Sequence, residues 1–104
     1  MHLRLDELPG RTVLDANGIL VGRIKVPLVE METWLVDTLR VRLRRAAAGE
    51  LGMAWSFWRR PTLDIPTGLI HAAGDAIILR VSLAELRETP PLQVSEETGS
   101  EAVH

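Results

Sequence analysis

Alternating apolar and polar positions in the first half of the chain predict β-strands. Residues 12–16 and 19–28 are two apolar, β-branched runs on either side of the dipeptide Asn17-Gly18. An Asn-Gly pair favours a type I′ turn, because both central residues of that turn need a positive φ angle, which Asn tolerates and Gly adopts freely. We therefore expect a tight antiparallel hairpin near the N-terminus, with Gly18 at positive φ.

The strand after this hairpin is expected to cover residues 34–44. Its apolar residues Leu39, Val41 and Leu43 alternate with arginines, which predicts an inward apolar face and an outward basic face. The shorter expected elements are a lead-in strand within residues 1–9, a turn at 9–10, a turn at 30–33, an extended piece at 63–66, a turn at 73–75 and a buried strand at 76–81.

The same periodicity assigns an interior to the predicted sheet. Gly22, inside the second hairpin arm, is expected to mark a bulge, a bend or a close approach of two backbones. The side chains assigned to the interior are Leu14, Leu20, Ile24, Val26, Leu39, Val41, Ile77 and Leu79.

Two later segments complete the expected elements. Residues 46–58 fit a helical stripe and a strand equally well, so both remain open for this segment. Ser82 is expected to cap a short helix through Arg87, with Glu85 at the capping-box position. Pro, Ser, Glu, Thr and Gly dominate after this helix, so residues 89–104 are expected to form a disordered acidic tail.

Length and composition narrow the class of protein. A chain of 104 residues is the size of one domain, which we assign to residues 1–88. The chain has no cysteine, which excludes a disulfide framework and a thiolate nucleophile. Neither a signal peptide nor an apolar run long enough to span a membrane is present in this sequence, so a cytoplasmic location is expected.

The net charge of −2 divides unevenly along the chain. Residues 1–87 hold all 12 basic side chains and 10 of the 14 acidic ones, which gives the body a net charge of +2. Nucleic-acid binding domains are usually far more basic, so nucleic acid is not the expected partner. Every basic residue except Lys25 is arginine, which genomic composition bias explains more simply than an anion-binding role.

One group of side chains stands out as a candidate for binding. Trp55, Phe57, Trp58, Arg59 and Arg60 form the one cluster of aromatic and basic residues, and are the candidate interface. Such a cluster fits a packed core, a protein contact centred on aromatic residues and arginine, or a stacking surface for RNA.

Other polar groups give weaker signals. Arg40, Arg42, Arg44 and Arg45 form a basic ridge, which is the ordinary state of an outward strand face. The remaining candidates are three acids expected to be solvated, Glu30, Glu32 and Asp37, and one histidine expected to be packed or at the surface, His71. No catalytic residue, metal site or cofactor site is therefore expected.

Residues 5–24 resemble the opening of PRC-barrel domains, and three later segments resemble the end of these domains. Such domains occur in the photosynthetic reaction-centre H subunit and in the C-terminal half of a ribosome-maturation factor. The matching positions are Leu8, Gly10, Val13, Asp15, Gly18, Gly22, Arg23 and Ile24, followed by Ile65-Pro66, Gly74-Asp75 and Ile77-Ile78-Leu79. Residues 46–60 show no pattern of that family. The resemblance implies a small six-stranded barrel. Together with the short C-terminal helix that the capping box predicts, the expected fold is an all-β, PRC-type barrel with one helix near its C-terminus.

The resemblance also implies a class of function. Domains of this kind serve as assembly or docking modules, often as dimers, and the barrel itself does not catalyse a reaction. The expected function is therefore a non-enzymatic protein–protein interaction module that forms a homodimer and binds a further, unidentified protein. The alternative is an RNA- or ribosome-associated accessory protein similar to the maturation factor.

Overall fold

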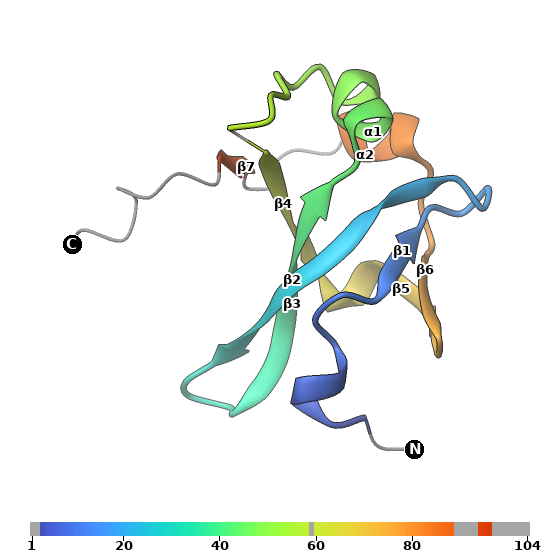
Figure 1. Cartoon of the computed structure of the whole chain (residues 1–104). Helices are drawn as coiled ribbons and strands as arrows, with labels where there is room; N and C mark the ends of the chain where they lie inside the picture. The colour runs from blue at the N-terminus through green and yellow to red at the C-terminus, as the bar shows by residue number, and fades with distance from the viewer. Residues whose placement is uncertain (1–2, 59, 89–93, 97–104) are drawn as a thin grey trace.

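One mixed β-sheet organises the protein (Figure 1). The computed structural model describes residues 3–58, 60–88 and 94–96. The sheet order is β5-β6-β1-β2-β3-β4-β7. The strands are β1 Thr12–Leu14, β2 Leu20–Glu30, β3 Leu35–Leu43, β4 Pro61–Pro66, β5 Ile70–Ala73, β6 Ala76–Leu79 and β7 Val94–Glu96. The helices are α1 Arg45–Glu50 and α2 Leu83–Glu88, with short 3-10 turns η1 Leu5–Glu7 and η2 Thr67–Leu69.

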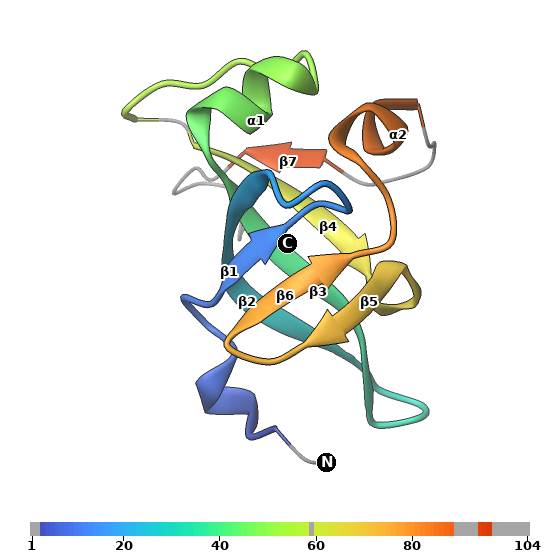
Figure 2. The same ribbon diagram turned by 90° about the vertical axis from the view of Figure 1, so that its right-hand side faces the viewer.

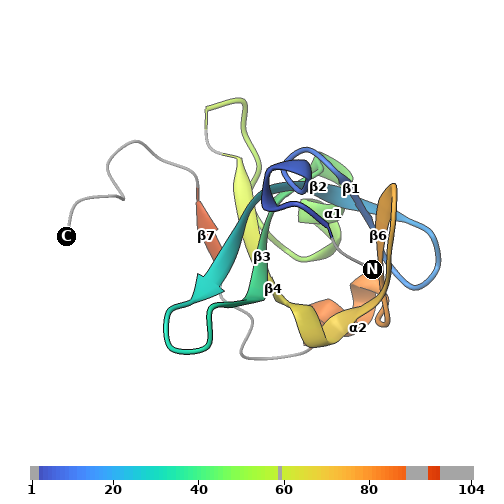
Figure 3. The same ribbon diagram turned by 90° about the horizontal axis from the view of Figure 1, so that it is seen from below.

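The sheet curls but does not close. Figures 2 and 3 show β1, β6 and β5 facing β3 and β4 across the interior, with β2 passing from one side to the other. Neighbouring strands are antiparallel except β1 and β6, which pair in parallel. In the described part of the chain β5 and β7 are the sheet's edges, so the structure is a half-barrel rather than the closed barrel expected. The 3-10 turn η2 carries the chain from β4 to β5 without pairing these two strands.

The first hairpin forms as expected, with a different turn. Gly18 has a φ of +80°, which confirms the left-handed glycine. Asn17 does not have a positive φ, so the prediction of a type I′ turn was wrong. The carboxylate of Asp15 accepts hydrogen bonds from the N–H groups of Asn17 (2.9 Å) and Ile19 (2.8 Å). These bonds favour a three-residue loop that ends in a left-handed glycine over the two-residue turn.

Gly22 marks a close approach of β2 and β3, as expected. A Cβ atom placed on Gly22 would lie 2.1 Å from the carbonyl oxygen of Arg42. Only glycine therefore allows the two strands to come this close.

Helix α2 begins with the predicted capping box. The Ser82 hydroxyl accepts the N–H of Glu85 (3.1 Å), and the Glu85 carboxylate accepts the N–H of Ser82 (3.0 Å). The second carboxylate oxygen of the buried Asp15 accepts the N–H of Leu83 (3.0 Å). The first hairpin and the last helix are thus joined through one side chain.

The core differs from the predicted interior in β1 and β2. Ile24, Leu39, Val41, Ile77 and Leu79 are buried, as expected. Val26 is instead 37% exposed, Leu14 and Leu20 are half-buried, and Val21 is fully buried. The β2–β3 register shifts between Ile24 and Val26, so a strict two-residue alternation does not hold along β2.

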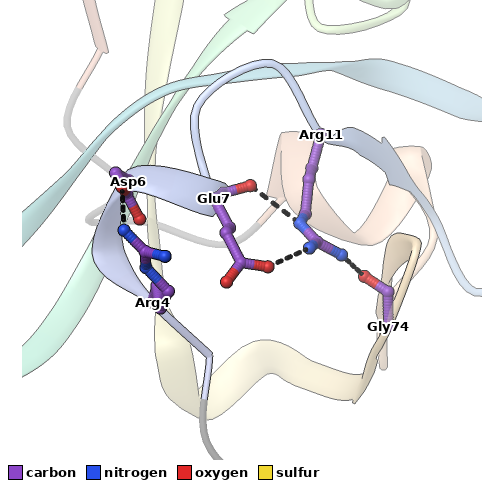
Figure 4. Close-up of polar contacts among 5 residues, drawn as sticks. All are labelled: Arg4, Asp6, Glu7, Arg11 and Gly74. Atoms are coloured by element: carbon purple, nitrogen blue, oxygen red, sulfur yellow. Dashed lines mark hydrogen bonds and ion pairs between the residues drawn. The ribbon is translucent and has the colours of Figure 1, made fainter.

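The N-terminal segment is a 3-10 turn, so the expected lead-in strand was wrong. The backbone of η1 is satisfied locally, since the N–H of Glu7 donates to the carbonyl oxygen of Arg4 at 3.0 Å. The Arg11 guanidinium then holds η1 in place by donating to the carbonyl oxygen and the carboxylate of Glu7 and to the carbonyl oxygen of Gly74 (Figure 4). This one side chain connects η1, β1 and the turn between β5 and β6.

The segment that the sequence left open between helix and strand is now defined. The ambiguous stretch is helical only in α1, and residues 51–60 have no regular secondary structure where they are described. Helices α1 and α2 contact each other at one end of the sheet (Figures 1 and 2).

Within the tail expected to be disordered, Val94–Glu96 forms β7 and pairs with β4. This pairing gives hydrogen-bond partners to backbone groups at the outer edge of β4. Residues 89–93 and 97–104 lie outside the described part.

Candidate binding surface

The predicted aromatic cluster lies on the irregular segment after α1. Phe57 and Trp58 are 66% and 84% exposed, so they are surface residues and not core. Their rings meet edge to face, with centroids 5.2 Å apart and planes at 84°. Trp55 is half-buried and packs against the core. Arg59 lies outside the described residues.

The side chains of two arginines, one on each side of Trp55 in the sequence, lie beside its ring. The guanidinium carbon of Arg45, at the start of α1, lies 5.5 Å from the centroid of the Trp55 ring. That of Arg60 lies 5.8 Å from the same ring and 5.7 Å from the Phe57 ring. Both arginines lie within the range of cation–π attraction, which favours guanidinium groups beside aromatic rings. The aromatic residues therefore position basic groups as well as presenting apolar surface.

A basic pocket of about 620 Å³ opens next to Trp55. Its walls come from the turn at residues 9–10, from β2 and β3, from the start of α1 and from the end of the irregular segment. The basic residues that line it are Arg23, Lys25, Arg42, Arg44, Arg45 and Arg60. None of the described lining residues is acidic. The electrostatic character of this pocket is thus strongly positive in a protein whose net charge is −2.

The fold brings the pocket's cations together by strand pairing. Arg23 on β2 lies directly opposite Arg42 on β3, so the strand register places these two cationic side chains next to each other. A guanidinium N–H of Arg23 donates to the carbonyl oxygen of Gly10 at 3.1 Å, which fixes Arg23 at the pocket wall. Arg44 and Arg45 enter at the junction of β3 and α1, where Arg44 occupies the N-cap position without a side-chain capping bond.

The predicted basic ridge is divided in the structure. Arg40 forms a two-point ion pair with the largely buried Asp64, with distances of 2.8 and 3.0 Å. Arg42, Arg44 and Arg45 line the pocket instead. At one end of the ridge an arginine is paired across β3 and β4, and at the other end the arginines line the pocket.

The remaining polar candidates stay separate. Glu30, Glu32 and Asp37 are exposed, and His71 is exposed on β5. Across residues 3–58, 60–88 and 94–96, no three His, Cys, Asp or Glu side chains gather in a way that would hold a metal ion. Within the same residues, no helix is long and apolar enough to cross a membrane.

A second apolar surface lies at the end of the β2–β3 hairpin, which projects from the body of the protein in Figures 1 and 2. Met31, Trp34 and Leu35 are 66%, 71% and 65% exposed. Trp34 has a φ of +60°, and no other non-glycine residue of the described chain has a positive φ. The sequence pattern placed Trp34 in a strand and gave no sign of this conformation.

The pocket itself was not predicted, although its parts were visible. The alternation put Arg23 and Lys25 on one side of the second hairpin arm, and placed Arg42 and Arg44 on the outer face of the next strand. Pairing these two strands in register would have gathered the four side chains on one surface. The contribution of Arg60 depends on the path of an irregular segment, which no periodicity describes.

Comparison with known proteins gives no further assignment. The sequence matches no model of a protein family, and it is not significantly similar to any curated protein. The class of protein defined so far is a mostly β protein with a curled mixed sheet and two short helices, which carries an exposed aromatic pair beside a basic pocket.

Proposed function

We propose that this chain is a non-enzymatic interaction module of PRC-barrel type, which forms a homodimer through Phe57, Trp58 and Arg60 and recruits a further protein in the cytoplasm. The carrying observation is the exposure of the two neighbouring aromatic rings, at 66% and 84%. Isolated exposed apolar residues are ordinary, but paired aromatics beside an arginine are the groups that dominate protein interfaces.

The fold supports this proposal at a coarser level. A curled sheet, the left-handed Gly18 and the close backbone approach at Gly22 agree with the PRC-type arrangement that the sequence resembles. The exposed aromatic pair supplies the functional groups that a shared fold does not by itself provide.

A second copy is the simplest partner for the aromatic pair. Most oligomers of a single chain are symmetric, and a two-fold axis brings the same surface patch of both copies together. Phe57 and Trp58 would then bury each other's exposed rings, and Arg60 would lie beside them.

The test is a paired substitution of the exposed rings, Phe57→Ser with Trp58→Ser. Trp55 is left intact because it packs against the core. We expect the wild-type protein to be a dimer by size-exclusion chromatography with light scattering. We expect the variant to be a folded monomer, because loss of aromatic interface residues weakens association by about tenfold or more.

The control is Trp34→Ser, which removes a tryptophan of similar exposure (71%) from the other apolar surface. This variant is expected to remain a dimer. A wild-type protein that stays monomeric at high micromolar concentration would contradict the proposal. So would a Trp34 variant that dissociates as readily as the paired one.

One observation favours the alternative, an RNA- or ribosome-associated accessory protein. The basic pocket lies beside Trp55, and single-stranded nucleic acids are bound by positive grooves with aromatic side chains. Retention of the protein on ribosomes in a sucrose gradient, lost when Arg44 and Arg45 are replaced by glutamine, is the result expected from this second candidate.

A further inference from the structure

We infer that the basic pocket is a binding site for a compact polyanion with adjacent phosphoryl groups, held by Arg23, Arg44, Arg45 and Arg60. This ligand differs from the protein partner proposed above, and the inference does not rest on that proposal. The pocket's volume of about 620 Å³ is within the range of small-molecule sites.

The charge of the lining points to the ligand's chemistry. Arg23, Arg44, Arg45 and Arg60 converge on one concavity, and none of its described lining residues is acidic. Guanidinium groups form two parallel hydrogen bonds with phosphate oxygens, which makes arginine the preferred residue for such ligands. An anion with several charges would offset the mutual repulsion of these groups.

Three of these arginines are also held in position before any ligand binds. Arg45 and Arg60 lie beside Trp55, at 5.5 and 5.8 Å from its ring centroid. Arg23 is fixed by its hydrogen bond to the carbonyl oxygen of Gly10. Ordering a free arginine side chain opposes binding, so restraint of this kind favours affinity.

The shape of the positive surface favours a compact ligand over a nucleic-acid strand. Further along β3 the next outward arginine, Arg40, is paired with Asp64. Near the pocket's other wall, Arg11 is occupied by Glu7 and by Gly74 (Figure 4). A strand of RNA needs a groove that follows its backbone. Here the positive charge is instead concentrated in one pocket.

The experiment measures binding of inorganic triphosphate to the full chain by isothermal titration calorimetry. The test variant combines Arg44→Gln with Arg45→Gln, both exposed residues of the pocket rim. We expect its dissociation constant to rise by about tenfold or more, since each charge-assisted hydrogen bond contributes about that factor. The matched control combines Arg80→Gln with Arg87→Gln, which removes the same charge outside the pocket and is expected to bind as the wild type does.

Three outcomes would overturn the inference. The first is a wild-type protein that does not bind triphosphate, and the second is an equal loss in the test and control variants. The third comes from a single-stranded RNA without terminal phosphates: tighter binding of this RNA than of triphosphate would assign the pocket to nucleic acid.

Circular dichroism verifies that each variant is folded. If the double variant is unfolded, Arg44→Gln alone or Arg60→Lys replaces it. Arg60→Lys keeps the charge but loses the two-point geometry, so weaker binding is expected.

Discussion

Trp34 combines backbone strain with exposure. Its φ of +60° lies in the left-handed region, which costs a residue with a side chain about 1–2 kcal/mol. The conformation closes the hairpin, because the N–H of Trp34 donates to the carbonyl oxygen of Glu30 at 2.7 Å. Because 71% of Trp34 is exposed, burial of its indole ring offsets little of this conformational free energy.

We expect Trp34→Gly to be more stable than Trp34→Ala by about 1 kcal/mol, because glycine enters the left-handed region without steric conflict. Both variants lack the indole ring, so their difference isolates the backbone. Urea unfolding followed by circular dichroism gives the two free energies of unfolding. Equal stabilities would show that this turn carries no such strain.

At the scale of elements, Asp15 connects parts of the chain that are far apart in sequence. Its carboxylate accepts three backbone N–H groups, from Asn17, Ile19 and Leu83. The residue is only 1% exposed, so water cannot replace these bonds if the carboxylate is removed. The hairpin turn and the start of α2 thus depend on the same two oxygens.

Asp15→Ala is therefore expected to lower the free energy of unfolding by about 3 kcal/mol or more, since buried donors without a partner are costly. Asp15→Asn keeps one carbonyl oxygen and is expected to lose less. Chemical denaturation measures both, with Asp37→Ala as an exposed control. If Asp15→Ala and Asp37→Ala are equally stable, the connection has no energetic role.

Local signals explain why several elements were predictable. Gly18, the Ser82–Glu85 capping box and the alternation in β3 are each encoded within a few residues. The bond from Leu83 to Asp15 spans 68 positions, and no local pattern contains it. The basic pocket was missed for the same reason, because it depends on the register that sets Arg23 opposite Arg42. The exposure of Trp58 depends on an irregular segment and likewise has no periodic signal.

At the scale of the molecule, the core formed by the described residues lies within the first 86 positions. Every described residue that is buried in the hydrophobic core lies between Leu8 and Leu86. β7 adds three residues at the edge of β4 and pairs with no other strand of the described sheet. The stability of the body is therefore expected to depend little on the residues after α2.

A chain that ends at Glu88 is expected to fold, with a melting temperature within about 4 °C of the full chain, which corresponds to less than about 1 kcal/mol. Scanning calorimetry of both chains makes the comparison. A truncated chain without a cooperative transition would show that the C-terminal residues are needed for folding.

The parallel pairing of β1 with β6 has a consequence for how the protein is made. Thr12 pairs with Ala76, so 64 further residues must be synthesised after Thr12 before its partner exists. At the usual rate of translation this takes about 3–13 s, far longer than a hairpin needs to form. During that interval the nascent chain carries β1 with one edge unpaired, which is the kind of edge that aggregates. The first strand of the sheet therefore gains its second neighbour only after β2, β3, β4 and β5 have been synthesised.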